Sequence, residues 1–175
     1  RKLARDPLVA ARCPVIAEAA AIVGDVQVRS LGTLVGSICN ADPGADYPAV
    51  LIALEAEVEV SGNRGPRTVR VEDFFQGPAE TGLEPDELVL AVRIRDARAC
   101  AYVRRPCGQA GYALVGVAAR VEVDGGRIRR AVLGVTGVGP RPYRAAEAAE
   151  ALAGEAPLPA AFAGAVRGIA RGTVD

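Results

Sequence analysis

Three residue types are missing from this chain of 175 residues, which contains no histidine, no methionine and no tryptophan. Aromatic residues make up only 4% of it. Without histidine, the chain cannot supply an imidazole base, a Ser-His pair or a histidine ligand to a metal. Most hydrolase mechanisms are therefore excluded within this chain.

Cysteine is scarce, and its spacing does not suggest a metal site. The four cysteines stand at positions 13, 39, 100 and 107, and no two of them are separated by two residues. Structural zinc sites and [2Fe-2S] clusters usually draw on closely spaced cysteines. We therefore expect no metal site in this chain.

The chain also lacks an excess of charge and a long apolar run. Its 21 basic residues balance 21 acidic ones, so no overall field favours nucleic acid. No apolar run approaches the roughly 18 residues that would span a membrane, and the N-terminal stretch lacks the apolar core of a secretory signal. We expect a cytoplasmic protein. Because position 1 is not methionine, we also expect the chain to be a fragment or processed product of a longer protein.

Hydrophobic patterning predicts an α+β fold in two units, residues 1–95 and 96–175. A helix is expected over Pro14–Val23, a short apolar helix follows Asp46, and alternation predicts strands. The strands fall at 57–62, from 67 onward with a helical turn at the end, and at 88–94. Clustered arginines and a proline in residues 95–107 indicate a connection between the units.

The second unit is expected to hold one hairpin and two helices. Two valine-rich segments, 112–123 and 127–138, flank "DGG", which is typical of a β-hairpin. Alanine-rich segments at 143–154 and 159–170 have helical spacing. Strands covered by helices are thus predicted in both units.

The segment "GTLVGSICNADPGAD", from Gly32 to Asp46, is predicted to be a long loop that binds a ligand. Its glycines would let exposed backbone amides form a concave site for phosphate, to which Thr33 and Ser37 add hydroxyl donors. Asp46 would repel phosphate and is better suited to accept hydrogen bonds from another polar part of a ligand. Such a combination suits a nucleotide.

A purely structural interpretation of this segment is also open. "ADPGAD" could simply cap the helix that begins near Asp46, since aspartate is a good N-cap residue. The segment is neither a Walker loop nor a Rossmann fingerprint, because no lysine follows a glycine and no strand leads through the loop into a helix.

Together with the segments C-terminal to it, this stretch resembles a known family. The order "VRSLGTLVGSICNADPGADYPAVLIALEAEVEV", "RTVRVEDFFQG", "LEPDELVLAVRI" and "YALVGVAARVEV" is similar to the FAD-binding medium subunit of the molybdenum hydroxylases, the xanthine dehydrogenase and aerobic carbon monoxide dehydrogenase proteins. The resemblance covers nearly the whole chain. It implies the C-terminal lobe of a PCMH-type FAD-binding domain at 1–95, followed by a small α+β carbon monoxide dehydrogenase flavoprotein C-terminal domain at 96–175.

The resemblance also implies where FAD binds. The family's T-[IL]-G-G-[NS] segment wraps the cofactor, Asp46 closes a motif that contacts it, and Val89 lies against the flavin. The residues that match the first motif are Thr33, Leu34, Val35, Gly36 and Ser37. No side chain of this chain is expected to be catalytic, because the flavin carries the chemistry.

The implied function is electron transfer. Electrons from a molybdopterin-containing large subunit would pass through a [2Fe-2S] small subunit to FAD, and then to an external acceptor such as NAD or a quinone. No contact with nucleic acid is expected.

Departures from the family pattern keep alternatives open. Val35 stands where relatives have a glycine, some relatives carry a lysine near Val103 and Arg104, and the family's A-G-G-[TQ]-x-L segment would precede Arg1. One alternative is a truncated scaffold subunit without flavin. Another is a stand-alone module that binds a mononucleotide.

Overall fold

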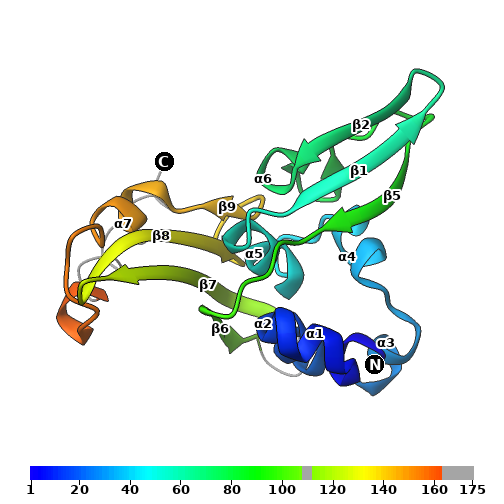
Figure 1. Cartoon of the computed structure of the whole chain (residues 1–175). Helices are drawn as coiled ribbons and strands as arrows, with labels where there is room; N and C mark the ends of the chain where they lie inside the picture. The colour runs from blue at the N-terminus through cyan, green and yellow to red at the C-terminus, as the bar shows by residue number, and fades with distance from the viewer. Residues whose placement is uncertain (108–111, 163–175) are drawn as a thin grey trace.

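The fold combines two larger antiparallel sheets, with a buried helix between them, and a two-stranded sheet of β3 and β4 (Figure 1). The computed structural model describes residues 1–107 and 112–162. The strands are β1 (Glu57–Gly62), β2 (Gly65–Arg70), β3 (Phe75–Gly77), β4 (Glu80–Thr81), β5 (Leu88–Arg93), β6 (Cys100–Pro106), β7 (Ala113–Asp124), β8 (Arg127–Thr136) and β9 (Tyr143–Arg144). The helices are η1 (Leu3–Arg5), α1 (Pro7–Arg12), α2 (Pro14–Ile22), α3 (Val26–Leu31), α4 (Leu34–Asn40), α5 (Asp46–Ala53), α6 (Val71–Phe74) and α7 (Ala146–Glu150).

The first sheet has three strands in the order β2-β1-β5, all antiparallel. In the central strand β1, Val58 and Val60 are fully buried, whereas the alternate residues are partly exposed. This is the period-2 pattern that the sequence predicted for a half-buried strand. The three strands expected in the first unit are confirmed, as is the helical turn after the second of them, which is α6.

The second sheet has four strands in the order β6-β7-β8-β9. Its long hairpin β7–β8 turns at Gly125 and Gly126, whose φ angles of 54° and 74° lie in the left-handed region that glycine adopts readily. The predicted hairpin is confirmed. The expectation of a mere connection over residues 95–107 is wrong, because β6 lies within it and pairs with β7. Charged residues and a terminal proline are tolerated there because β6 is an edge strand.

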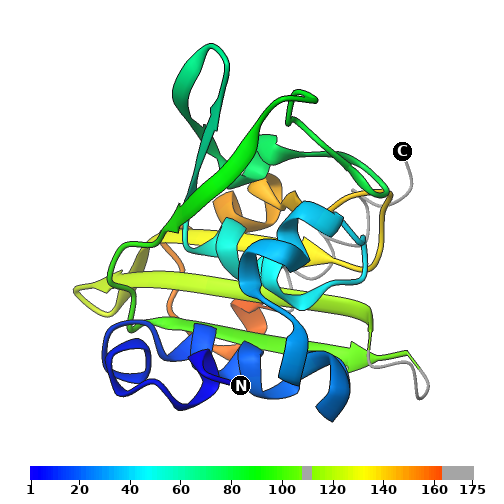
Figure 2. The same ribbon diagram turned by 90° about the vertical axis from the view of Figure 1, so that its right-hand side faces the viewer.

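Helix α5 lies across the four-stranded sheet, below the three-stranded one (Figure 2). All eight of its residues are buried, which explains why its sequence is apolar on every side. Gly134 of β8 permits the close approach, since a Cβ atom there would lie 2.0 Å from the Ala49 carbonyl oxygen of α5. On the other side of the hairpin, Leu133 and Val135 form a second core with the residues of α7.

Helix α2 confirms the prediction over 14–23. The helix expected over 143–154 is confirmed only in part, because Tyr143 and Arg144 form strand β9 on the edge of the sheet and α7 covers Ala146–Glu150. Most of the helix expected over 159–170 lies outside the described residues. Within the described ranges, no helix is both long enough and apolar enough to cross a bilayer.

The segment 32–46 is not one long loop, which corrects the prediction. Thr33 caps a short helix, α4, by accepting a hydrogen bond on its Oγ1 from the Gly36 amide at 2.8 Å. The irregular part is limited to the turn between Ala41 and Ala45. Asp46 does not cap α5, because Ala45 is the N-cap residue and Asp46 is the first residue of the helix.

Candidate functional site

A cavity of about 390 Å³ opens where α2 ends, α3 and α4 pass, and α5 begins. Four of the seven predicted site residues line it, namely Thr33, Gly36, Ser37 and Asp46. Other polar side chains of its wall are Arg1, Arg29, Asn40, Asp42, Tyr47 and Tyr112. Eight of the seventeen residues that line the cavity therefore belong to the segment 32–46 that the sequence singled out.

The first turn of α4 leaves two backbone amides without an acceptor inside the helix. The amides of Leu34 and Val35 have no acceptor within the helix, because no carbonyl precedes them by a full turn. The side chains of these two residues point elsewhere and line a different hollow, together with residues of α1 and α2 such as Ile16. The branched side chain of Val35, at a position where the resemblance implies glycine, thus does not line the cavity.

Asp46 is buried, with 3% of its surface exposed, and its carboxylate is held by two side chains of β6. Tyr102 donates its hydroxyl hydrogen at 2.6 Å, and the Arg104 guanidinium donates to the two carboxylate oxygens at 3.0 Å and 3.3 Å. Burial raises the pKa of Asp46, and the contacts with Tyr102 and Arg104 oppose this shift. The pKa of Tyr102 is raised as well, by burial and by its bond to Asp46.

Tyr102 supports the site through its hydrogen bond to Asp46, although the sequence did not predict this role. The available signal was period-2 spacing, because Tyr102 and Arg104 are alternate residues of one strand and so point to the same face. Because the sequence predicted a connection over residues 95–107, no strand and no shared face was predicted there. Arg104 also donates to the Ile22 carbonyl at 2.7 Å, which ties the end of α2 to the cavity wall.

The turn that leads into Asp46 is held by the ends of β7 and β8. Thr136 places its hydroxyl 2.7 Å from the Pro43 carbonyl oxygen and 2.8 Å from that of Ala45. The amide of Gly137 donates to Pro43 at 2.8 Å, and that of Ala113 donates to the Gly44 carbonyl at 3.1 Å. Residues of the second unit therefore determine the shape of a wall formed by the first.

Val89, the last predicted site residue, does not line this cavity. It lies in β5, half-buried and paired with Val60 of β1. Its contact with flavin stays a prediction. Among the described residues, no group of three His, Cys, Asp or Glu side chains could hold a metal ion.

Two family models match the chain. Residues 1–95 match the FAD binding domain in molybdopterin dehydrogenase, and residues 98–173 match the CO dehydrogenase flavoprotein C-terminal domain. The chain belongs to the FAD-binding family of the molybdopterin dehydrogenases. The resemblance inferred from the sequence and the expected α+β fold are both confirmed.

Curated relatives of this FAD-binding family are medium chains of dehydrogenases. The chain is 37% identical over 144 residues to the glyceraldehyde dehydrogenase medium chain of Sulfolobus acidocaldarius, covering 81% of this chain and 51% of that protein. It is 36% identical over 151 residues to the carbon monoxide dehydrogenase medium chain of Afipia carboxidovorans, covering 85% of this chain and 52% of that protein. The chain thus spans about half the length of these relatives.

Solved structures of the family have the same fold. A chain of carbon monoxide dehydrogenase from Hydrogenophaga pseudoflava superposes with a TM-score of 0.90 at 36% identity, over 95% of this chain and 59% of that one. A chain of quinoline 2-oxidoreductase from Pseudomonas putida 86 superposes with a TM-score of 0.89 at 30% identity, over 98% of this chain and 60% of that one. The two sheets and the helix between them thus have the geometry of a molybdopterin dehydrogenase FAD-binding domain and its C-terminal partner domain.

Proposed function

We propose that this chain binds FAD in the 390 Å³ cavity and serves as part of the electron-transfer medium subunit of a molybdenum hydroxylase. The observation that carries the proposal is that three of the five residues matching the family's FAD motif line this cavity. Thr33, Gly36 and Ser37 line it directly. Leu34 and Val35 contribute open backbone amides at the start of α4.

The residues present fit the polar half of such a cofactor. Two hydroxyls and two open amides suit the oxygens of a diphosphate, because backbone amides at a turn form an anion-binding concavity. Asp46 is placed in the wall with its charge compensated by Arg104, so it does not repel an anionic ligand as an unpaired carboxylate would. We propose that Asp46 and, from β5, Val89 complete the contacts.

The roles of the protein groups are to bind and to orient. No side chain is assigned to proton transfer or nucleophilic attack. When bound, FAD supplies the redox chemistry that links the [2Fe-2S] clusters of a small subunit, reduced by a molybdopterin-containing large subunit, with an external electron acceptor. The protein holds the cofactor and keeps water from its buried side.

The partners, the acceptor and the division of the chain at residues 95 and 96 are parts of this proposal. The medium chains among the relatives support the partners, since their names place them in multi-subunit dehydrogenases. The two family models, which meet between residues 95 and 98, support the division. The cytoplasmic location stays a prediction.

FAD titration of this chain and of its full-length medium subunit tests the proposal. Ser37→Leu places a bulky side chain in the cavity, whereas Ser61→Leu makes the same change in β1, at a residue that does not line the cavity. We expect the first variant to weaken FAD binding at least about tenfold, or about 1.4 kcal/mol. The second variant should bind like the wild type. Equal affinities of the two variants would contradict the site.

A scaffold subunit without flavin is the second candidate. The observation that favours it is that both carboxylate oxygens of Asp46 already accept hydrogen bonds from the protein. The same titration separates the candidates, because a scaffold would bind no FAD even as the full-length subunit.

A further inference from the structure

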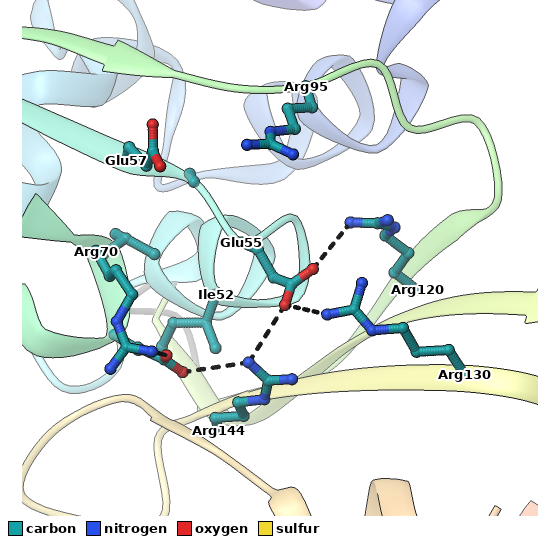
Figure 3. A pocket seen from close by; sticks show the side chains of 11 residues that line it. Ile52, Glu55, Glu57, Arg70, Arg95, Arg120, Arg130 and Arg144 are labelled. Atoms are coloured by element: carbon teal, nitrogen blue, oxygen red, sulfur yellow. Dashed lines mark hydrogen bonds and ion pairs between the residues drawn. The ribbon is translucent and has the colours of Figure 1, made fainter. Parts of the chain in front are cut away.

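A second cavity, of about 320 Å³, lies at the opposite end of α5 and is lined mainly by charged side chains (Figure 3). It shares no lining residue with the first cavity. Five of its residues are basic and three are acidic. They are Arg70, Arg95, Arg120, Arg130 and Arg144, with Glu55, Glu57 and Glu72. The lining therefore carries two positive charges more than negative ones.

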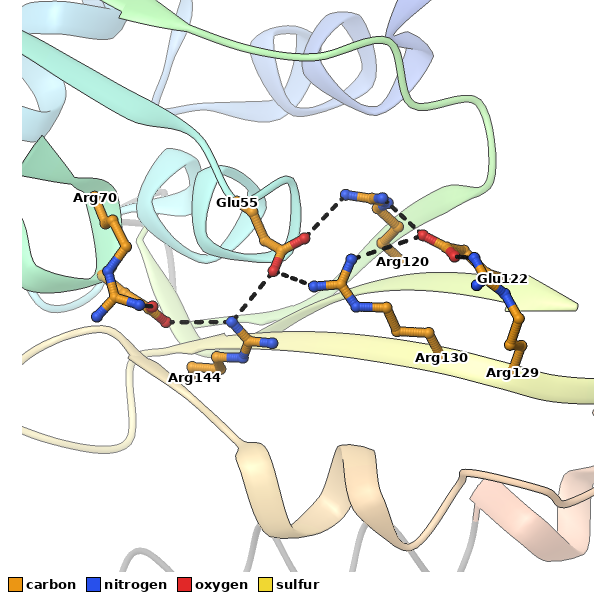
Figure 4. Close-up of polar contacts among 8 residues, drawn as sticks. Glu55, Arg70, Arg120, Glu122, Arg129, Arg130 and Arg144 are labelled. Carbon is orange, nitrogen blue, oxygen red and sulfur yellow. Dashed lines mark hydrogen bonds and ion pairs between the residues drawn. The ribbon is translucent and has the colours of Figure 1, made fainter. Parts of the chain in front are cut away.

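Glu55 gathers three of these arginines from an unusual backbone position. It follows α5 with a φ of 52°, where helices usually place glycine. Its carboxylate contacts Arg130, and Arg120 and Arg144 each at 3.3 Å (Figure 4). A glutamate in the left-handed region costs roughly 1 kcal/mol. The ion pairs offset that cost.

The arginines are not needed to cap α5. The amide of Ala56 donates to the Leu51 carbonyl at 3.0 Å, and the amide of Glu55 donates to the Ile52 carbonyl at 3.0 Å. These two bonds form a Schellman motif, which already satisfies the last turn of the helix. The positive charge around the cavity therefore has no local backbone role.

Arg95 differs from the other four arginines. Within residues 1–107 and 112–162 it makes no hydrogen bond or ion pair, whereas each of the others pairs with a carboxylate. Figure 3 shows its guanidinium directed into the cavity, between Glu57 and Arg120. A guanidinium without a carboxylate partner can donate two parallel hydrogen bonds to the oxygen atoms of an anion, and the neighbouring arginines add positive charge.

We propose that this cavity binds a small dianion whose charges lie on oxygen atoms, either a phosphate or a dicarboxylate. Arg95 supplies the open donors and a positive charge for the ligand. Four further arginines line the cavity, and carboxylates beyond the lining, Glu122 and Asp73, share three of them. The site is separate from the proposed flavin site, because α5 lies between the two cavities and its two ends contribute to different ones.

Isothermal titration calorimetry of the full-length medium subunit tests the proposal, with inorganic phosphate and malonate as separate probes. Titrations are run at about pH 8, above the second pKa of phosphate, and chloride at equal ionic strength is the blank. Arg95→Ala should weaken binding about tenfold. Arg64→Ala removes the same charge from the turn between β1 and β2, outside the cavity, and should change binding less than about twofold.

A third variant acts in the opposite direction. Glu57 lines the cavity and makes no side-chain hydrogen bond or ion pair within the part of the chain that the structure describes. Glu57→Gln removes a repulsive charge and should tighten binding several-fold. If Arg95→Ala loses binding of both phosphate and malonate, the site is supported. If it loses binding of only one of them, the site is supported and its ligand belongs to the class of that probe.

Two results would overturn the proposal. One is that neither probe binds the wild type above the chloride blank, and the other is that Arg95→Ala and Arg64→Ala bind equally. The flavin content of the same variants is measured in parallel and should not change. A failure here therefore leaves the proposed FAD site intact, and a failure of that site leaves this test valid.

Discussion

At the scale of single residues, Asp46 shows how burial and pairing act together. The carboxylate is removed from water, which by itself favours the protonated form and raises its pKa. Arg104, with only 15% of its side chain exposed, and the Tyr102 hydroxyl compensate for the lost hydration. The ion pair and hydrogen bond therefore stabilise a charge that would otherwise be costly at this place.

Asp46→Asn should destabilise the chain because it removes the buried negative charge that pairs with Arg104. Removing one partner of a buried ion pair costs about 3–5 kcal/mol of unfolding free energy. Tyr102→Phe removes one hydrogen bond to the carboxylate and should cost less, about 1.5–3 kcal/mol. Urea unfolding of both variants measures these values. An Asp46→Asn variant as stable as the wild type would show that the pair does not matter.

Glu87 gives the chain a defined dependence on pH. Hydrogen bonds from Arg67, at 2.7 Å and 2.6 Å, and from the Glu84 amide lower its pKa from 4.5 to about 2. A lowered pKa means that this contribution to stability is present above pH 4.5 and is lost as the pH falls towards 2.

We therefore compare the wild type with Glu87→Gln by thermal unfolding over this pH range. The wild type should unfold at the higher temperature near neutral pH, and the difference should shrink as the pH falls. A difference that stays constant with pH would mean that Glu87 titrates normally in the folded protein.

At the scale of elements, the contact between α5 and β8 depends on the absence of a side chain at Gly134. An added Cβ would lie 2.0 Å from a backbone oxygen of α5, which cannot turn aside as a side chain could. This contact also positions the turn before α5, whose carbonyls are bound by Thr136 and Gly137. The shape of the proposed flavin cavity thus depends on how α5 rests on the sheet.

Gly134→Ala should lower the free energy of unfolding by about 1–3 kcal/mol or more, since α5 must move away from the sheet. Gly139→Ala is the matched control, because its Cβ would meet only the Arg141 carbonyl oxygen at an ordinary 3.6 Å. Chemical denaturation measures both variants. Equal stabilities would mean that the helix and the sheet can separate without cost.

At the scale of the whole molecule, a charge network connects the end of α5 with the four-stranded sheet. Glu55 follows α5, whereas Arg120, Arg130 and Arg144 belong to β7, β8 and β9. Glu122 shares Arg120 and Arg130 with it (Figure 4). One carboxylate therefore helps to hold three strands of the four-stranded sheet against the first unit.

Glu55→Gln should reduce the free energy of unfolding by about 1 kcal/mol at low salt, since these side chains are partly exposed. The difference should become smaller at about 1 M salt, where such interactions are screened. Denaturation at the two salt concentrations measures it. A loss that does not depend on salt would point to backbone strain rather than charge.

The sequence by itself determined the elements whose signal is local. The helix Pro14–Ile22, the strand Glu57–Gly62 and the β7–β8 hairpin follow from periodicity and turn residues within a few positions of one another. The motif from Thr33 to Ser37 likewise contributed to the family resemblance and located three residues of one cavity wall. These features need no knowledge of distant contacts.

Only the tertiary structure decided what depends on residues far apart in the chain. Residues 100–106 form strand β6 because they pair with β7. Tyr102 donates a hydrogen bond to Asp46, which lies 56 positions away in the sequence. Thr136 reaches Pro43 across 93 positions, and the arginines around Glu55 come from separate strands. Local patterns report the period of a segment, but which side chains meet depends on how the two sheets pack on α5.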